Sequence, residues 1–153
     1  MRVEHITPFV ESAQRVLGST LGSEVRAGKL RLAPTPALFK GVAALVGLTG
    51  EVEGRVIFDM AMETALKIAS AMNGETFTTL SPLAQDSIAE LASMMIGNAV
   101  TALNDRGVKL KLTPTTLFVG ENMTASTTTL ETLVIPLSTV HGEVMVDVAV
   151  RTT

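Results

Sequence analysis

The sequence has no cysteine, tryptophan or tyrosine, and only five phenylalanines and two histidines among its 153 residues. The absence of cysteine excludes disulfide bonds, thiolate zinc sites and cysteine nucleophiles. His5 and His141 are too few for a histidine-rich metal centre, and no glycine-rich phosphate loop occurs, so we expect no metal or cofactor of the chain's own. Few aromatic residues and a net charge of −3 also argue against a nucleic-acid partner.

Long apolar runs are missing as well. No window of about eighteen uncharged apolar residues occurs, and no basic segment followed by an apolar one opens the chain, so we expect neither a membrane span nor a secretion signal. A soluble cytoplasmic protein is the expectation. With 46% hydrophobic and 18% charged residues, the chain has enough apolar surface for one core, and we expect a single domain over residues 1–153.

Helical spacing of apolar residues predicts three helices, over residues 6–21, 61–72 and 82–105. Each is bounded by residues typical of helix ends. These are Thr7-Pro8 and Gly22 for the first helix, Asn73-Gly74 for the second, and Ser81 and Gly107 for the third.

Apolar runs and alternating patterns predict strands over residues 29–33, 38–48, 52–59, 108–112, 130–140 and 143–151, with Pro34 and Pro36 as breaks. Turns at Thr49-Gly50 and His141-Gly142 predict two hairpins, and residues 121–129 are interpreted as a loop. Pro136 lies within a predicted strand and favours an edge, a bulge or the approach of another chain. The order of elements predicts an α+β fold, a mostly antiparallel sheet with three helices packed on it.

The helix predicted over residues 82–105 has an apolar stripe and an opposite polar face. The polar face recurs at intervals of three or four residues and contains Asp86, Glu90, Ser93, Gly97, Thr101 and Asn104. Such a face is typical of a solvated helix surface, and the spacing between Glu90 and Ser93 does not by itself identify a site.

The longer run from Ser87 to Ala99 resembles a helix of the CheX/CheC family of chemotaxis phosphatases, which dephosphorylate phospho-CheY. That helix carries Glu-x-x-Asn followed by Gly-Asn-Ala, and Asp86, Glu90 and residues 97–99 match it. Residues 3–9, 47–56, 72–74 and 137–146 also look like CheX counterparts in the same order. The resemblance covers nearly the whole chain and implies a CheC-like fold.

This resemblance also implies roles for individual residues. Glu90 would anchor a phosphorylated CheY-type receiver domain by pairing with the receiver's active-site lysine, and the partner-binding surface would comprise Asp86, Glu90, Met94 and Gly97. The family's catalytic asparagine, which orients the attacking water, falls at Ser93. The Mg²⁺ needed for phosphoaspartate chemistry would be held by the receiver. A homodimer is implied too, and we expect it to form through sheet edges, with the strands after Pro114 contributing.

Ser93 leaves the activity open, because a serine hydroxyl reaches less far than a carboxamide and aligns water less well. The chain is then either a phosphatase, weakened at this position, or a non-catalytic receiver-binding module, and an unrelated structural domain is a third reading. Asn98 is a candidate substitute amide. Glu11 and Gln14 repeat an acid–amide spacing on the first helix, and we interpret them as solvated surface.

Overall fold

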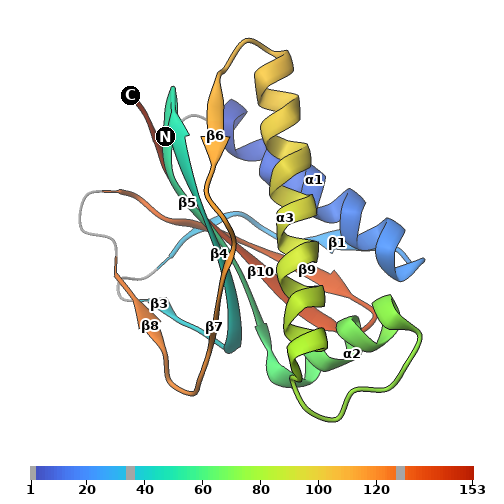
Figure 1. The fold of residues 1–153 in the computed structure, drawn as a ribbon. Helices are drawn as coiled ribbons and strands as arrows, with labels where there is room; N and C mark the ends of the chain where they lie inside the picture. Colours follow the sequence, from blue (N-terminus) through green and yellow to red (C-terminus); the bar gives the residue numbers. More distant parts are fainter. Residues whose placement is uncertain (1–2, 34–36, 127–129) are drawn as a thin grey trace.

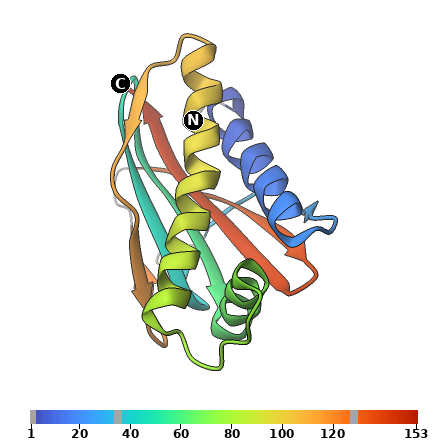
Figure 2. The same ribbon diagram turned by 45° about the vertical axis from the view of Figure 1, so that its right-hand side comes forward.

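Three helices cover one face of an antiparallel sheet in the computed structural model, which describes residues 3–33, 37–126 and 130–153 (Figures 1 and 2). The helices are α1 (Val3–Leu21), α2 (Met62–Asn73) and α3 (Pro82–Asp105). The long helices α1 and α3 pack against each other over the sheet, and the short α2 lies near the start of α3. The predicted α+β class with three helices on a mostly antiparallel sheet is confirmed.

Local signals at the ends of α2 and α3 act as the sequence predicts. The Ser81 hydroxyl accepts a hydrogen bond from the backbone N–H of Ala84 at 3.3 Å, which caps the first turn of α3. Gly74 follows α2 in the left-handed conformation, with φ of 64°, which glycine adopts without steric cost. Both helices therefore have the bounds expected from the sequence to within a residue.

The predicted start of the first helix at Thr7-Pro8 is wrong, because α1 begins at Val3 and contains Pro8. Proline removes one intrahelical hydrogen bond, so the first turn needs other support. The side chains at the start of α1 stabilise it by packing into the core, since Ile6 is 2% exposed and His5 is 6% exposed. The His5 ring also lies against the hydroxyl of Thr152 near the C-terminus, at 3.4 Å.

The main sheet has the strand order β1-β9-β10-β5-β4-β6, with β2 also paired to β9 and β7 also paired to β4, all antiparallel. Two short strands, β3 and β8, pair with each other separately. The strands are β1 (Arg26–Ala27), β2 (Arg31–Leu32), β3 (Ala37–Leu38), β4 (Gly41–Gly50), β5 (Val52–Ala61), β6 (Leu110–Leu112), β7 (Thr116–Val119), β8 (Thr124–Ala125), β9 (Leu133–Thr139) and β10 (Gly142–Thr152).

Both predicted hairpins are present, as β4–β5 and β9–β10. The predicted strand over residues 38–48 is in part wrong, since Leu38 belongs to β3 and β4 begins only at Gly41. The strands β1 and β7 were not expected, and β8 lies inside the predicted loop 121–129. The rest of that loop at 127–129, and the predicted breaks at Pro34 and Pro36, lie outside the described residues.

Pro136 lies in β9, one strand in from the edge. Its carbonyl accepts a hydrogen bond from the N–H of Gly28 at 2.7 Å, between the short strands β1 and β2. In an antiparallel strand, the N–H and the carbonyl of one residue point toward the same neighbouring strand. The position where the proline lacks an N–H therefore faces the short strands β1 and β2, not β10. Pro136 is therefore not in an edge strand, but the side of β9 that lacks its N–H pairs only with two-residue strands, so few ladder hydrogen bonds are lost.

Alternate residues of the strands face the helices and form the core. Phe58 on β5 and Val146 on β10 are fully buried there, against Phe9 of α1 and Leu91 and Met95 of α3, each at most 1% exposed. Burying one such side chain contributes about 1.5–3 kcal/mol. This apolar contact fixes which side of α3 faces the sheet and which side is left to solvent.

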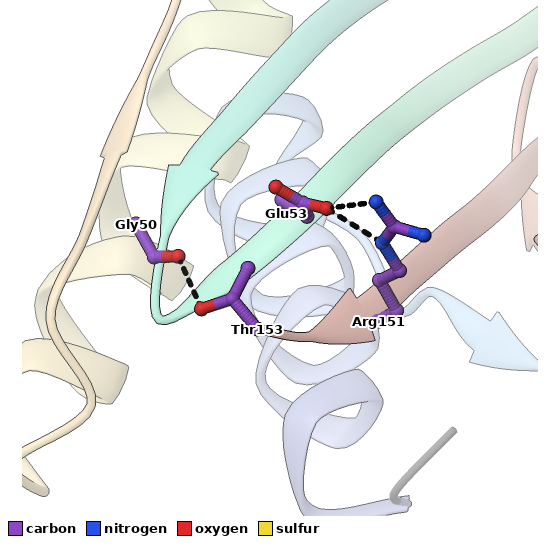
Figure 3. Close-up of polar contacts among 4 residues, drawn as sticks. All are labelled: Gly50, Glu53, Arg151 and Thr153. Atoms are coloured by element: carbon purple, nitrogen blue, oxygen red, sulfur yellow. Dashed lines mark hydrogen bonds and ion pairs between the residues drawn. The ribbon is translucent and has the colours of Figure 1, made fainter.

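The C-terminal end of β10 is fastened to the β4–β5 turn, as Figure 3 shows. The Arg151 guanidinium pairs with the Glu53 carboxylate on the neighbouring strand, and the Thr153 hydroxyl donates to the carbonyl of Gly50 at 2.8 Å. These contacts keep the last strand in register up to the end of the chain.

Candidate functional site

The side of α3 turned away from the sheet carries the residues singled out in the sequence. Asp86 and Glu90 are exposed, as expected, while Ser93 and Gly97 are half-buried. These four residues lie within about 60° of the helix circumference, because a residue advances by about 100° along an α-helix. Met94 lies beside them and is 41% exposed. One face of α3 therefore holds two exposed carboxylates beside a half-buried hydroxyl and a half-buried glycine.

The β6–β7 segment runs alongside α3 (Figure 2). Ser93 lies on the flank of the face nearest this segment, because its hydroxyl contacts Thr115. Its hydroxyl is 3.0 Å from the carbonyl oxygen of Ala89 in the preceding turn. It is also 2.7 Å from the hydroxyl of Thr115, in the segment just before β7. The sequence analysis did not find Thr115, since 22 residues separate it from Ser93.

Gly97 has open space where a side chain would project, because no heavy atom beyond its chain neighbours and the adjacent helix backbone lies within 4 Å of the position of an added Cβ. Glycine inside a helix costs about 0.5–1 kcal/mol relative to alanine, and packing within the described chain gives no reason for it. Asn98 is exposed, but an ideal helix places it about 140° around the axis from Ser93. The structure therefore places the candidate substitute amide on the opposite flank of the face.

The side chains of Ser87 and Asn73 lock α2 to α3 beneath this face. The Asn73 amide donates to the Ser87 hydroxyl at 2.7 Å and to the carbonyl of Ala69 at 2.8 Å. The Ser87 hydroxyl in turn donates to the carbonyl of Leu83 at 3.0 Å. Both residues belong to the segments that carry the family resemblance, and their contacts are structural.

Glu11 and Gln14 do not form a second site of the same kind. Glu11 is exposed, whereas the Gln14 amide donates to the carbonyl of Val25 at 2.7 Å and ties α1 to the chain that follows it. The interpretation as solvated surface is correct for Glu11. It is wrong for Gln14, because this side chain is half-buried and its hydrogen bond to Val25 joins α1 to the following segment.

Comparison with known proteins gives the family. The family model "Chemotaxis phosphatase CheX" matches residues 42–138. The chain belongs to the CheX family. It is 29% identical over 119 residues to the CheY-P phosphatase CheX of Thermotoga maritima, which covers 77% of each protein.

Solved structures of a CheX and of a CheC-like protein share the whole fold. CheX in the CheX–CheY–BeF3–Mg²⁺ complex from Borrelia burgdorferi is 35% identical, with a TM-score of 0.83 and coverage of 98% of this chain and 99% of that one. A CheC-like superfamily protein from Shewanella is 25% identical, with a TM-score of 0.89 and coverage of 99% of each chain. The suspected resemblance to CheX proteins and the CheC-like fold are thereby confirmed.

The opposite face of the sheet in this CheX-family chain holds two buried carboxylates that the sequence analysis missed. Asp59 on β5 is 4% exposed and Asp147 on β10 is 3% exposed. Burial raises the pKa of Asp59 to about 6 from 3.8, although hydrogen bonding and the charge of Lys40 oppose the shift. Burial likewise raises the pKa of Asp147, against the hydrogen bond that Arg55 donates to it at 2.8 Å. The strand alternation of residues 52–59 showed where Asp59 falls but gave no sign that this second face is covered.

Within the part of the chain that the structure describes, no three His, Asp or Glu side chains lie close enough to hold a metal ion. No described helix is long and apolar enough to cross a membrane.

Proposed function

We propose that this CheX-family protein binds a phosphorylated CheY-type receiver domain through the exposed face of α3 and promotes hydrolysis of the receiver's aspartyl phosphate. The observation that carries the proposal is that Asp86, Glu90, Ser93 and Gly97 share one face of the helix that the family model covers, with both carboxylates exposed and the other two residues half-buried. Two relatives support it by their names: one is a CheY-P phosphatase, and another was solved with CheY, BeF3 and Mg²⁺.

Glu90 supplies the docking contact in this proposal. Its carboxylate is exposed on the third turn of a helix capped by Ser81, where it can pair with the receiver's active-site lysine without first breaking the fold. A charged contact of this kind contributes to orientation and to association rate as well as to affinity. Asp86 and Met94 border the contact, and Gly97 lets the receiver approach the backbone of α3 closely.

Ser93 contacts the attacking water in this proposal. In hydrolysis a water oxygen forms a bond to phosphorus while the bond between phosphorus and the receiver's carboxylate oxygen breaks. The carboxylate leaves with the electron pair, and the water gives up a proton as inorganic phosphate forms. The phosphatase then needs only to orient the water, with no covalent intermediate on its own side chains. The Mg²⁺ that neutralises the phosphoryl charge would belong to the receiver.

The alternative is a docking module without turnover, since Ser93 replaces the family's asparagine. The family name and the curated relative favour the phosphatase over this alternative. A direct test mixes the protein with several phosphorylated CheY-type receivers and follows phosphate release. Acceleration supports the phosphatase, binding without acceleration supports the docking module, and the absence of both contradicts this proposal.

The proposal includes a homodimer and a cytoplasmic location. The edge strand β7, which follows Pro114, pairs only with β4 among the described residues, and its Phe118 and Val119 are each 47% exposed. An edge with unpaired backbone groups and exposed apolar side chains favours pairing with another chain, and a second copy covers both. The cytoplasm is where phosphorylated receiver domains would meet this protein.

A further inference from the structure

Ser93 alone makes an incomplete substitute for a carboxamide. A carboxamide offers a donor and an acceptor at once, whereas a serine hydroxyl has one proton. In an isolated helix, that proton bonds to the carbonyl of the preceding turn, here Ala89 at 3.0 Å. The hydroxyl would then present only lone pairs to solvent, and a water molecule there would have an acceptor but no donor.

Thr115 changes this balance. Its hydroxyl lies 2.7 Å from that of Ser93, a short distance typical of a good O–H···O hydrogen bond, and either oxygen can be the donor. Ser93 has one proton, so its hydroxyl donates either to the carbonyl of Ala89 or to the hydroxyl of Thr115. When it donates to Thr115 instead of Ala89, the proton of Thr115 becomes available to an outside acceptor, and the lone pairs of Ser93 remain free. The two hydroxyls together then present one donor and one acceptor, as a carboxamide does.

The segment that carries Thr115 is held on both sides. The Thr113 hydroxyl accepts from the N–H of Gly47 on β4 at 2.8 Å, and the Thr113 N–H donates to the carbonyl of Gly47 at 2.9 Å. A Cβ at position 47 would lie 3.0 Å from the Thr113 hydroxyl, so glycine permits this close approach. On the other side, Thr116 begins β7 and is in register with Leu45 of β4. The hydroxyl of Thr115 is therefore placed before any receiver binds.

We propose that Thr115 is a catalytic residue for the hydrolysis, and that the Ser93–Thr115 hydroxyl pair orients the attacking water in place of the family's asparagine. This inference rests on the proposed function. One O–H of the water donates to Ser93, the Thr115 hydroxyl donates to the water oxygen, and the remaining lone pair of the water is directed at phosphorus. Neither hydroxyl is consumed, and the proton that the water loses passes to the phosphate product or to solvent.

The test compares Thr115→Val with Thr115→Ser in steady-state release of phosphate from one phosphorylated receiver. Valine has the shape of threonine without the hydroxyl, so we expect kcat to fall about tenfold, the size of one lost hydrogen bond, with KM unchanged. Thr115→Ser keeps the hydroxyl and should retain most of kcat. Thr116→Val, one residue along at an exposed position, is the matched control and should leave both constants unchanged.

A second measurement separates a catalytic unit from a structural contact. Because the two hydroxyls act together, Ser93→Ala combined with Thr115→Val should be no slower than the slower single variant. In a Ser93→Asn background, Thr115→Val should have little effect, since the amide supplies both donor and acceptor. Equal loss of kcat in the two backgrounds, or Thr115→Ser as slow as Thr115→Val, would overturn the role given to Thr115.

The two proposals fail in different ways. An active parent protein whose Thr115→Val variant is equally fast contradicts this inference alone. A parent protein that accelerates phosphate release from none of the receivers contradicts the proposed function and, with it, the role of Thr115.

Discussion

Both carboxylate oxygens of Asp59 accept a hydrogen bond from the backbone N–H of Lys40, at 2.9 and 3.1 Å. Lys40 precedes β4 and Asp59 lies near the end of β5, so the contact closes the open end of the β4–β5 hairpin. The carboxylate is buried on the sheet face away from the helices, near Asp147, whose charge adds to the rise in the pKa of Asp59. The hairpin is thus closed by a carboxyl group whose pKa burial raises to about 6.

The raised pKa of Asp59 predicts a fall in stability as pH increases. The folded protein keeps its proton up to about pH 6, whereas the unfolded chain loses it near pH 3.8. The contribution of Asp59 to the free energy of unfolding is therefore greatest below about pH 4 and is lost as the pH rises through 6. Asp59→Asn should reduce this fall, although Asp147, whose pKa is also raised, still contributes to it, and should raise stability at pH 7.5 by on the order of 1 kcal/mol. Urea unfolding at several pH values measures it, with Asp86→Asn as an exposed control; parallel curves for Asp59→Asn and the parent would contradict the prediction.

Glu90→Ala should separate docking from folding. Because Glu90 is exposed, we expect its loss to change the free energy of unfolding by no more than about 0.5 kcal/mol. The affinity for a phosphorylated receiver should fall about tenfold or more, since a charged contact at the interface is removed. Titration calorimetry or fluorescence anisotropy measures the affinity. Glu11→Ala on α1 is the matched control, and equal affinities for the two variants would show that the docking face lies elsewhere.

Ser93→Asn should raise the phosphatase rate. The amide reaches further toward the receiver than the Ser93 hydroxyl, and a half-buried position at the edge of an exposed helix face should accept it. We expect a gain of about tenfold to a hundredfold, equivalent to about 1.4–2.7 kcal/mol of activation free energy. Phosphate release from one receiver under equal loading is the measurement. A rate that stays level or drops while binding is retained would show either that the Ser93 hydroxyl already performs the task or that the deficit lies elsewhere.

Gly97→Ala should have opposite effects on stability and binding. Open space surrounds the position, so alanine should stabilise α3 by about 0.5–1 kcal/mol. The added methyl group stands where the receiver approaches, and receiver affinity should decrease. Gly18→Ala on α1 is the control, because the same gain in helix propensity is expected there without loss of affinity. Gly97→Ala that binds as well as Gly18→Ala would argue against close approach at this position.

Phe118→Lys should weaken self-association. A lysine on the exposed apolar edge strand β7 disfavours pairing of two copies through that edge. Light scattering at micromolar concentration should show a dimer for the parent protein and a lower mass for the variant. Leu83→Lys, at an equally exposed position on α3, should leave the dimer intact. A monomeric parent protein would contradict the proposed homodimer.

The sequence by itself determined the elements that depend on neighbouring residues. The apolar period of residues 82–105, with Ser81 before it, is sufficient to place α3 and to show that Glu90 and Ser93 share its polar face. The β4–β5 and β9–β10 hairpins follow in the same way from alternation and turn residues. Each of these signals acts within a few residues along the chain, where spacing and intrinsic preference dominate.

Only the tertiary structure decided the features that depend on distant segments. Pro8 lies inside α1 because burial of the first turn outweighs the missing hydrogen bond, and Asp59 has a raised pKa because the far face of the sheet is covered. Thr115 meets Ser93 because β7 pairs with β4 alongside α3. Contacts of this kind join residues that no local period relates, since their energy comes from burial and hydrogen bonds formed only once the sheet has assembled.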